Sequence, residues 1–215
     1  MVCKVLTVSY GICFNTYFFP LKASELVDGL EKKGYEINPR LPFPRPPVAL
    51  TGAGSIARKG KTVISVDTRS QVLGITDVSV KSVLDSCNEI TNMLKEDYQI
   101  DLESLTGVYE FVVQCEASIE KQAYETIAKN VEIPILNKVE EILQKKLWPL
   151  ELRFGGADTK VNSANWFEFS IEPNFTRNDS YLVNVTHRTE KKEESTSFIE
   201  SFEENINRII ELIDK

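Results

Sequence analysis

Apolar and polar residues alternate in two stretches of the chain, residues 6–14 and 109–117. A period of two is typical of a β-strand with one buried face. The two stretches lie 103 residues apart, and each is followed by a short amphipathic helix pattern, at residues 23–30 and 124–131. The pattern therefore predicts the same strand–helix unit twice.

Further strand patterns follow each unit in the same order. The segment "TVISVDT" from Thr62 corresponds to "NWFEFSI" from Asn165, again at an offset of 103. A further strand is predicted in each half from "QVLGITD" and "YLVNVTH". Each half then ends in a longer helix, and the second of these has apolar residues from Phe198 to Ile213 at intervals of three and four.

This order predicts an internally duplicated α+β protein. We expect a single domain, residues 1–215, made of two structural repeats, approximately 1–105 and 106–215, each with the order β-α-β-β-α. Joined, the repeats would form one curved antiparallel sheet of about eight strands with helices on one face. An additional helix is predicted in the second repeat, from Leu136 to Leu143.

The order of elements, over nearly the whole chain, resembles the duplicated architecture of the TATA-box-binding protein fold. The resemblance implies a curved sheet with helices on its convex side. A pair of ferredoxin-like or small-molecule-sensing βαββ modules has the same element order and stays open as the alternative. Fold does not determine function, so DNA binding does not follow from the resemblance.

The alternation also predicts which side chains lie on the sheet face away from the helices. They include Thr7, Ser9, Gly11, Cys13, Ser65, Asp67, Glu110, Val112, Gln114, Glu116, Trp166, Glu168 and Ser170. This open face is polar and acidic, and its carboxylates would repel a phosphate backbone. Glu110, Glu116, Trp166 and Glu168 are the candidate ligand-binding residues there.

One basic segment, "NPRLPFPRPPVALTGAGSIARKGK" (residues 38–61), contrasts with a formal net charge of −7. Its candidate anion- or nucleic-acid-binding residues are Arg40, Arg45, Arg58, Lys59 and Lys61. The glycine spacing does not match a phosphate-binding loop, and Thr62 begins a strand rather than a helix. A stiff, solvated connector or a hairpin with charges that protect a sheet edge is the alternative.

The composition and motifs bear on membrane insertion, secretion and cofactor binding. No run of 18 apolar residues occurs, so no membrane span is expected. The amino terminus lacks the pattern of a signal peptide, and we expect a cytoplasmic protein whose four cysteines are small buried residues. The sequence shows no metal-ligand spacing and no cofactor motif, and His187 is the only histidine.

These observations favour a non-catalytic binding or regulatory module that uses the open sheet face or its flanking loops for a ligand or protein partner. Nucleic-acid binding through residues 40–61 is one alternative. A hydrolase or transferase with carboxylates in a cleft between the repeats is another. If the apolar stripe of the C-terminal helix is wider than the sheet needs, it could support a homodimer.

Overall fold

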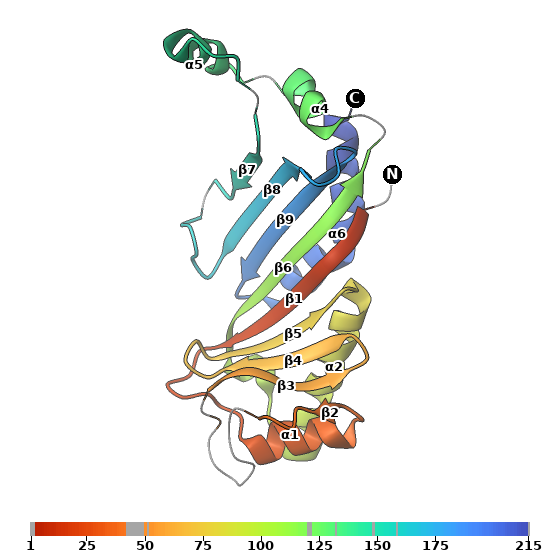
Figure 1. Cartoon of the computed structure of the whole chain (residues 1–215). Helices are drawn as coiled ribbons and strands as arrows, with labels where there is room; N and C mark the ends of the chain where they lie inside the picture. The colour runs from red at the N-terminus through yellow and green to blue at the C-terminus, as the bar shows by residue number, and fades with distance from the viewer. Residues whose placement is uncertain are drawn as a thin grey trace.

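The computed structural model describes residues 3–41, 50, 52–119, 122–131, 133–147, 149–157 and 159–214. Within these residues the chain forms an α+β fold with one open, nine-stranded sheet and six helices (Figure 1). Every pair of neighbouring strands is antiparallel. The predicted α+β class and antiparallel sheet are therefore confirmed, with nine strands instead of about eight.

The sheet order is β2-β3-β4-β5-β1-β6-β9-β8-β7. The strands are β1 (Cys3–Phe14), β2 (Glu36–Ile37), β3 (Ala53–Lys59), β4 (Thr62–Asp67), β5 (Val72–Asp77), β6 (Thr106–Ser118), β7 (Leu152–Gly155), β8 (Trp166–Pro173) and β9 (Ser180–Thr189). The two longest strands, β1 and β6, pair at the centre. We call this pair the central seam. From it, β5, β4 and β3 continue on one side and β9, β8 and β7 on the other.

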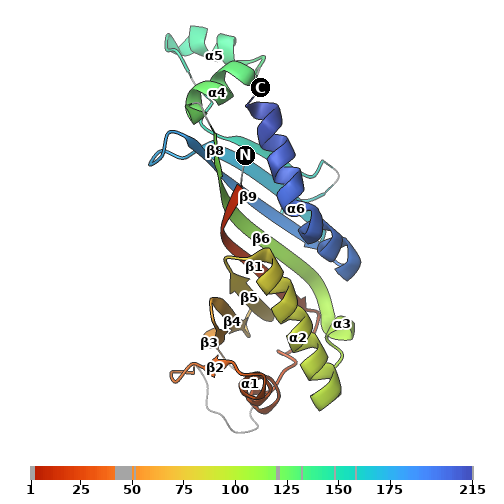
Figure 2. The same cartoon turned by 90° about the vertical axis from the view of Figure 1, so that its right-hand side faces the viewer.

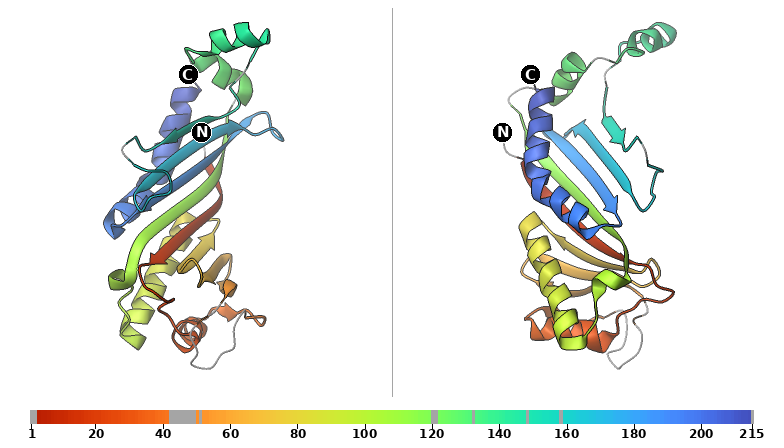
Figure 3. Two further views of the ribbon diagram at one scale, coloured as in Figure 1. Left: turned by 90° about the vertical axis from the view of Figure 1, so that its left-hand side faces the viewer. Right: turned by 180° about the vertical axis from the view of Figure 1, so that it is seen from behind.

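The two long helices, α2 (Val80–Tyr98) and α6 (Lys192–Ile213), lie on the same face of the sheet, each mainly over its own half (Figures 2 and 3). The other described helices are α1 (Ala23–Lys32), α3 (Leu102–Leu105), α4 (Ala123–Asn130) and α5 (Leu136–Leu143). The hydroxyl of Ser79 accepts the Ser82 N–H and caps α2. None of the described helices is long and apolar enough to cross a membrane.

The core lies between the sheet and these helices. Val8, Tyr10 and Ile12 of β1 are buried there, as the alternation predicts. A register shift between Val5 and Thr7 interrupts the alternation, so that Cys3 and Val5 also pack against the core. A β-bulge of this kind moves the residues beyond it to the other face of the strand, which the period-two pattern does not reveal.

Candidate ligand site between helix α6 and strand β8

Helix α6 carries more apolar surface than the sheet beneath it covers. Ile199, Phe202, Ile206 and Ile210 are buried, and their spacing of three and four residues forms the stripe that rests on the sheet. Other apolar side chains of the same helix remain partly or largely exposed: Phe198, Ile209 and Leu212. The helix therefore has an apolar flank that does not lie in the core.

A groove of about 410 Å³ runs between this flank and the outer strands. We call it the α6 groove. Its lining residues are Phe167 and Phe169 of β8, Val185 of β9, and Phe198, Phe202, Asn205, Ile206, Arg208, Ile209 and Leu212 of α6. A concave, mainly apolar surface with a few polar groups, of roughly 300–1,000 Å³, is typical of small-molecule sites.

Aromatic rings form the walls of the α6 groove. The Phe198 ring makes edge contacts with Phe167, with centroids 5.8 Å apart, and lies 6.5 Å from the Phe202 ring. On β7, the ring of Phe154 stacks on Phe169 at 6.0 Å and is itself 54% exposed. These rings hold one another in fixed orientations, so the groove presents a preformed apolar surface.

One cation stands at the rim of the α6 groove. Arg208 is exposed, and it makes no hydrogen bond or ion pair with any residue that the structure describes. Asn205, one turn earlier, donates to the Ser201 hydroxyl at 3.2 Å. The guanidinium thus has its donors free beside an apolar groove. This arrangement suits a ligand with an apolar body and an anionic end.

His187 packs against Phe198 of the aromatic wall but does not itself line the α6 groove. Its ring stacks on Phe198 with centroids 4.2 Å apart, and its buried Nδ1 has no hydrogen-bond partner among the described residues. Burial lowers the pKa of His187, and the charge of Glu194 opposes that shift. His187 and Phe198 also line a separate, more open hollow with Glu193 and Glu194. The stacked imidazole supports the Phe198 ring from outside the α6 groove.

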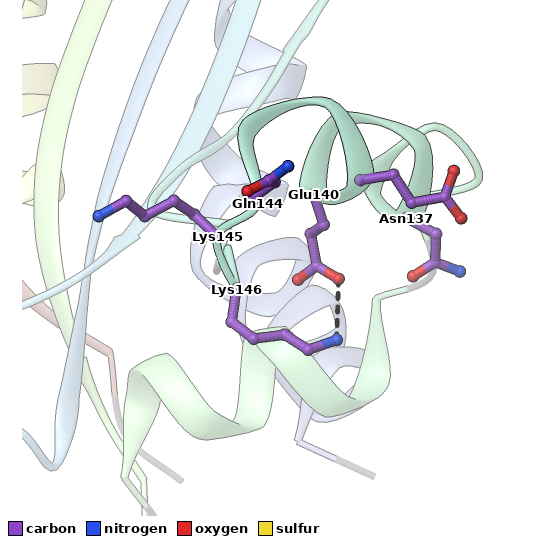
Figure 4. A pocket seen from close by; sticks show the side chains of 6 residues that line it. Asn137, Glu140, Gln144, Lys145 and Lys146 are labelled. Carbon is purple, nitrogen blue, oxygen red and sulfur yellow. Dashed lines mark hydrogen bonds and ion pairs between the residues drawn. The ribbon is translucent and has the colours of Figure 1, made fainter.

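A larger hollow, of about 500 Å³, lies within the segment around α5 (Figure 4). Its central carboxylate, Glu140, accepts the Leu147 N–H at 2.9 Å and pairs with Lys146 at 3.1 Å. These bonds lower the pKa of Glu140. The hollow is lined by residues of one continuous segment, and its acid is already engaged in closing the turn after α5. We therefore take the α6 groove as the better candidate site.

The acids predicted to bind a ligand on the open face have partners within the chain. Glu110 pairs with Arg188 at 3.1 Å, and Glu168 pairs with Arg153. The carboxylate of Glu116 is buried, where it accepts hydrogen bonds from three side chains: Asn174 at 3.0 Å, Ser180 at 2.9 Å and Arg177 at 3.3 Å.

Trp166 is buried, with 7% of its surface exposed, whereas the sequence suggested an exposed ring on the open face. Gly155 of the neighbouring strand β7 explains the difference. A Cβ atom at Gly155 would lie 3.0 Å from Cη2 of the indole, so the missing side chain makes room for the ring. The alternation places Trp166 on the correct strand but does not show what covers it.

The basic residues of the segment at 38–61 are spread along an edge of the sheet. Arg40, Arg58 and Lys61 are exposed, and Arg45 lies outside the described residues. Lys59 is engaged, with its ammonium 2.9 Å from Glu89 and above the Tyr35 ring. Gly60, at φ +63°, forms the hairpin turn between β3 and β4. An anion-binding patch at this edge remains a prediction.

The sequence contained one signal for the α6 groove. It is the apolar stripe of the last helix, which on sequence alone supports a homodimer only if the stripe is wider than the sheet needs. Arg208 gave no signal, because its position beside the groove depends on the packing of α6 against β8. Within the described residues, no group of three or more His, Cys, Asp or Glu side chains could hold a metal ion.

No protein-family model matches the chain, and no curated protein matches it in sequence.

Proposed function

We propose that the protein is a non-catalytic binding module for a small amphipathic carboxylate, and that the α6 groove is its binding site. One observation carries the proposal: an apolar groove of about 410 Å³ with aromatic walls has an arginine without a partner in the described chain at its rim. The open sheet face supports binding less well, because its acids already have partners in the chain.

The chemistry of the groove defines the class of ligand. An alkyl chain lying along Ile209 and Leu212, lining side chains that are partly or largely exposed, would gain about 0.8 kcal/mol for each methylene group removed from water. A carboxylate at the end of this chain would accept hydrogen bonds from the Arg208 guanidinium, which offers two parallel donors. A neutral ligand of equal length would gain only the apolar contribution.

We also propose that the two halves of the chain are an internal duplication in the manner of the TATA-box-binding protein fold. The orders β5-β4-β3 and β9-β8-β7 outward from the central seam support this proposal, whereas the edge strand β2 has no counterpart. In such an arrangement the α6 groove would be specific to the second half, since α1 lies beside α2 in the first half (Figure 2).

The test compares decanoate with decanol, each below its aggregation concentration, by calorimetric titration of the full chain. We expect decanoate to bind, and we expect octanoate to bind more weakly because it buries two fewer methylene groups. Replacing Arg208 with glutamine should weaken decanoate binding about tenfold, equivalent to about 1.4 kcal/mol. The same substitution should leave the affinity for decanol unchanged.

Arg153→Gln is the matched control, because Arg153 is exposed but pairs with Glu168 away from the groove. It should leave the binding of both ligands unchanged. Equal losses for decanoate in R208Q and R153Q would contradict a specific role for Arg208. Absence of decanoate binding to the unmodified chain would refute the proposed function itself.

A further inference from the structure

Two of the four cysteines lie next to each other across the central seam. Val5 of β1 is paired with Cys115 of β6, and Cys3 is paired with Ala117, so Cys3 and Cys115 are diagonal neighbours. The register shift between Val5 and Thr7 places Cys3 on the core side, where it packs against the cluster that contains Cys115. Both thiols therefore point to the same face of the sheet, beneath α6.

The two side chains already interact. The largest influence on the pKa of each thiol is hydrogen bonding with the other thiol. That bond lowers the pKa of Cys3, against the opposing effects of burial and of Glu203. The same bond, together with burial, raises the pKa of Cys115. Cys3 is the half-buried member of the pair, and Cys115 is buried. The two thiols thus differ in reactivity: Cys3 forms a thiolate more readily and is the one a reagent can reach.

We propose that Cys3 and Cys115 are a redox-active pair that forms a reversible disulfide across the central seam, with a low-molecular-weight disulfide such as oxidised glutathione as the oxidant. This site is separate from the α6 groove, and the proposal does not depend on the nature of the ligand bound there.

The reaction follows ordinary thiol–disulfide exchange. The Cys3 thiolate attacks one sulfur of oxidised glutathione, the glutathione disulfide bond breaks, and one glutathione thiolate leaves. Cys115 then gives up its proton, and its thiolate attacks the Cys3 sulfur of the mixed disulfide. The second glutathione thiolate leaves. In total the protein loses two hydrogen atoms, and one oxidised glutathione becomes two reduced glutathione molecules.

The position of the pair gives the disulfide a structural effect. Diagonal neighbours on antiparallel strands are about 7–8 Å apart at Cα, which exceeds the usual disulfide range of about 4.4–6.8 Å, so the start of β1 must shift towards β6 for the bond to form. A bond there would join the start of β1 to β6, two strands that belong to different halves of the chain. It would close a long loop in the unfolded chain and so favour the folded state.

The other two cysteines provide internal controls. Cys13 also belongs to β1, but it pairs with Val108 of β6 and Val72 of β5 near the far end of the strand. Cys87 is buried on α2, where burial raises its pKa to about 11. Neither is next to another cysteine in the strand register, so Cys13→Ser and Cys87→Ser should leave the proposed bond intact.

The experiment incubates the folded full chain with oxidised glutathione and follows intact mass, a non-reducing peptide map and the melting temperature. We expect a mass lower by two hydrogen atoms, a peptide link between Cys3 and Cys115, and a higher melting temperature that reduction reverses. C13S and C87S should behave in the same way. C3S should not oxidise, and C115S should stop with one glutathione attached to Cys3.

Three results would overturn the proposal. The unmodified chain could retain glutathione on Cys3 without forming the internal link, it could stay reduced throughout, or it could link a different pair of cysteines. C3S serves as the second variant if C115S fails to fold, because Cys3 is only half-buried. Loss of the link in C3S with retention in C13S supports the proposal without any measurement on C115S.

Discussion

Apart from the edge strand β2, the strands follow the same order outward from the central seam in both halves of the sheet, but the helical cover of the two halves differs. In the first half, α1 buries Ala23, Leu26, Val27 and Leu30 completely or almost completely. In the second half, α4 buries Ala123 and Ile127, and its last residue, Asn130, donates to the Ile213 carbonyl at the end of α6.

The next helix, α5, projects away from the sheet (Figure 3) and has no buried residue. Phe154 and Leu212 are consequently exposed beside β8, at 54% and 70%. Apolar residues of the outer helix are thus covered in the first half, whereas an apolar flank of α6 stays exposed in the second half.

The largest predicted effect contrasts the two outer helices directly. Leu26→Ala in α1 removes a side chain with no exposed surface, and we expect the free energy of unfolding to fall by about 2–5 kcal/mol because a cavity remains. Ile142→Ala in α5 alters a side chain that is 79% exposed, and we expect a change within about 0.5 kcal/mol. Urea unfolding at equilibrium measures both.

Equal destabilisation by the two substitutions would contradict the difference in cover, since it would mean that α5 packs in solution as tightly as α1. A change in the slope of the unfolding free energy against urea concentration for I142A would also contradict the difference in cover. That slope reflects the surface exposed on unfolding.

The strands and long helices follow from the sequence because their patterns are local and regular. Each central strand alternates over at least six residues, and α2 and α6 repeat over several turns. Strand β7, "LRFG", has four residues, and the pattern predicts no strand there. A strand of that length forms because β8 supplies its partner, and a local pattern does not contain that information.

The second prediction concerns a feature that the two halves share. Each half buries an acid that accepts a hydroxyl donor: Thr62 donates to Asp77 at 2.6 Å, and Ser180 donates to Glu116 at 2.9 Å. Removing the hydroxyl by Thr62→Val or by Ser180→Ala should destabilise the chain by about 1–3 kcal/mol in each case, because a buried carboxylate loses a donor. Thermal unfolding of both variants measures the effect.

A loss of stability in T62V but not in S180A would show that buried hydrogen bonds contribute less to stability in the second half than in the first. Ser9→Ala is a suitable control, since Ser9 bonds only to the Thr76 hydroxyl on the half-buried open face. It should change stability less than either substitution.

The smallest effect concerns the ends of β5 and β9, where Asp77 in the first half corresponds in the pattern to His187 in the second. Burial lowers the pKa of His187, so the folded chain binds fewer protons than the unfolded chain below about pH 6.5. Stability should therefore fall as the pH decreases from about 6.5 towards the lowered pKa. The charge of Glu194, on the facing helix, reduces this effect.

His187→Gln removes the titrating group, and its measured stability should decrease less than that of the unmodified chain between about pH 7.5 and about pH 5.5. Denaturant titrations at both values give the comparison. A steeper decrease in the variant would mean that His187 is stabilised in its charged form by the chain.

The candidate site could be predicted from the sequence less well than the fold, because the site depends more on tertiary packing. The acids on the open face have the expected register, but their partners Arg188 and Asn174 come from other parts of the chain. Residue type alone could not distinguish acids that are free to bind from acids that already have partners. The α6 groove depends on the angle and position of one helix, which no local pattern specifies.

The central seam also has a consequence for the order in which the chain is made. Strand β1 is synthesised first and can pair with β5 once residue 77 has emerged from the ribosome, but its other edge is paired by β6, which ends at Ser118. At about 5–20 residues per second, an edge of up to twelve residues stays open for several seconds. During that interval a nascent first half presents an unpaired strand edge, which is the kind of surface that can pair with another chain.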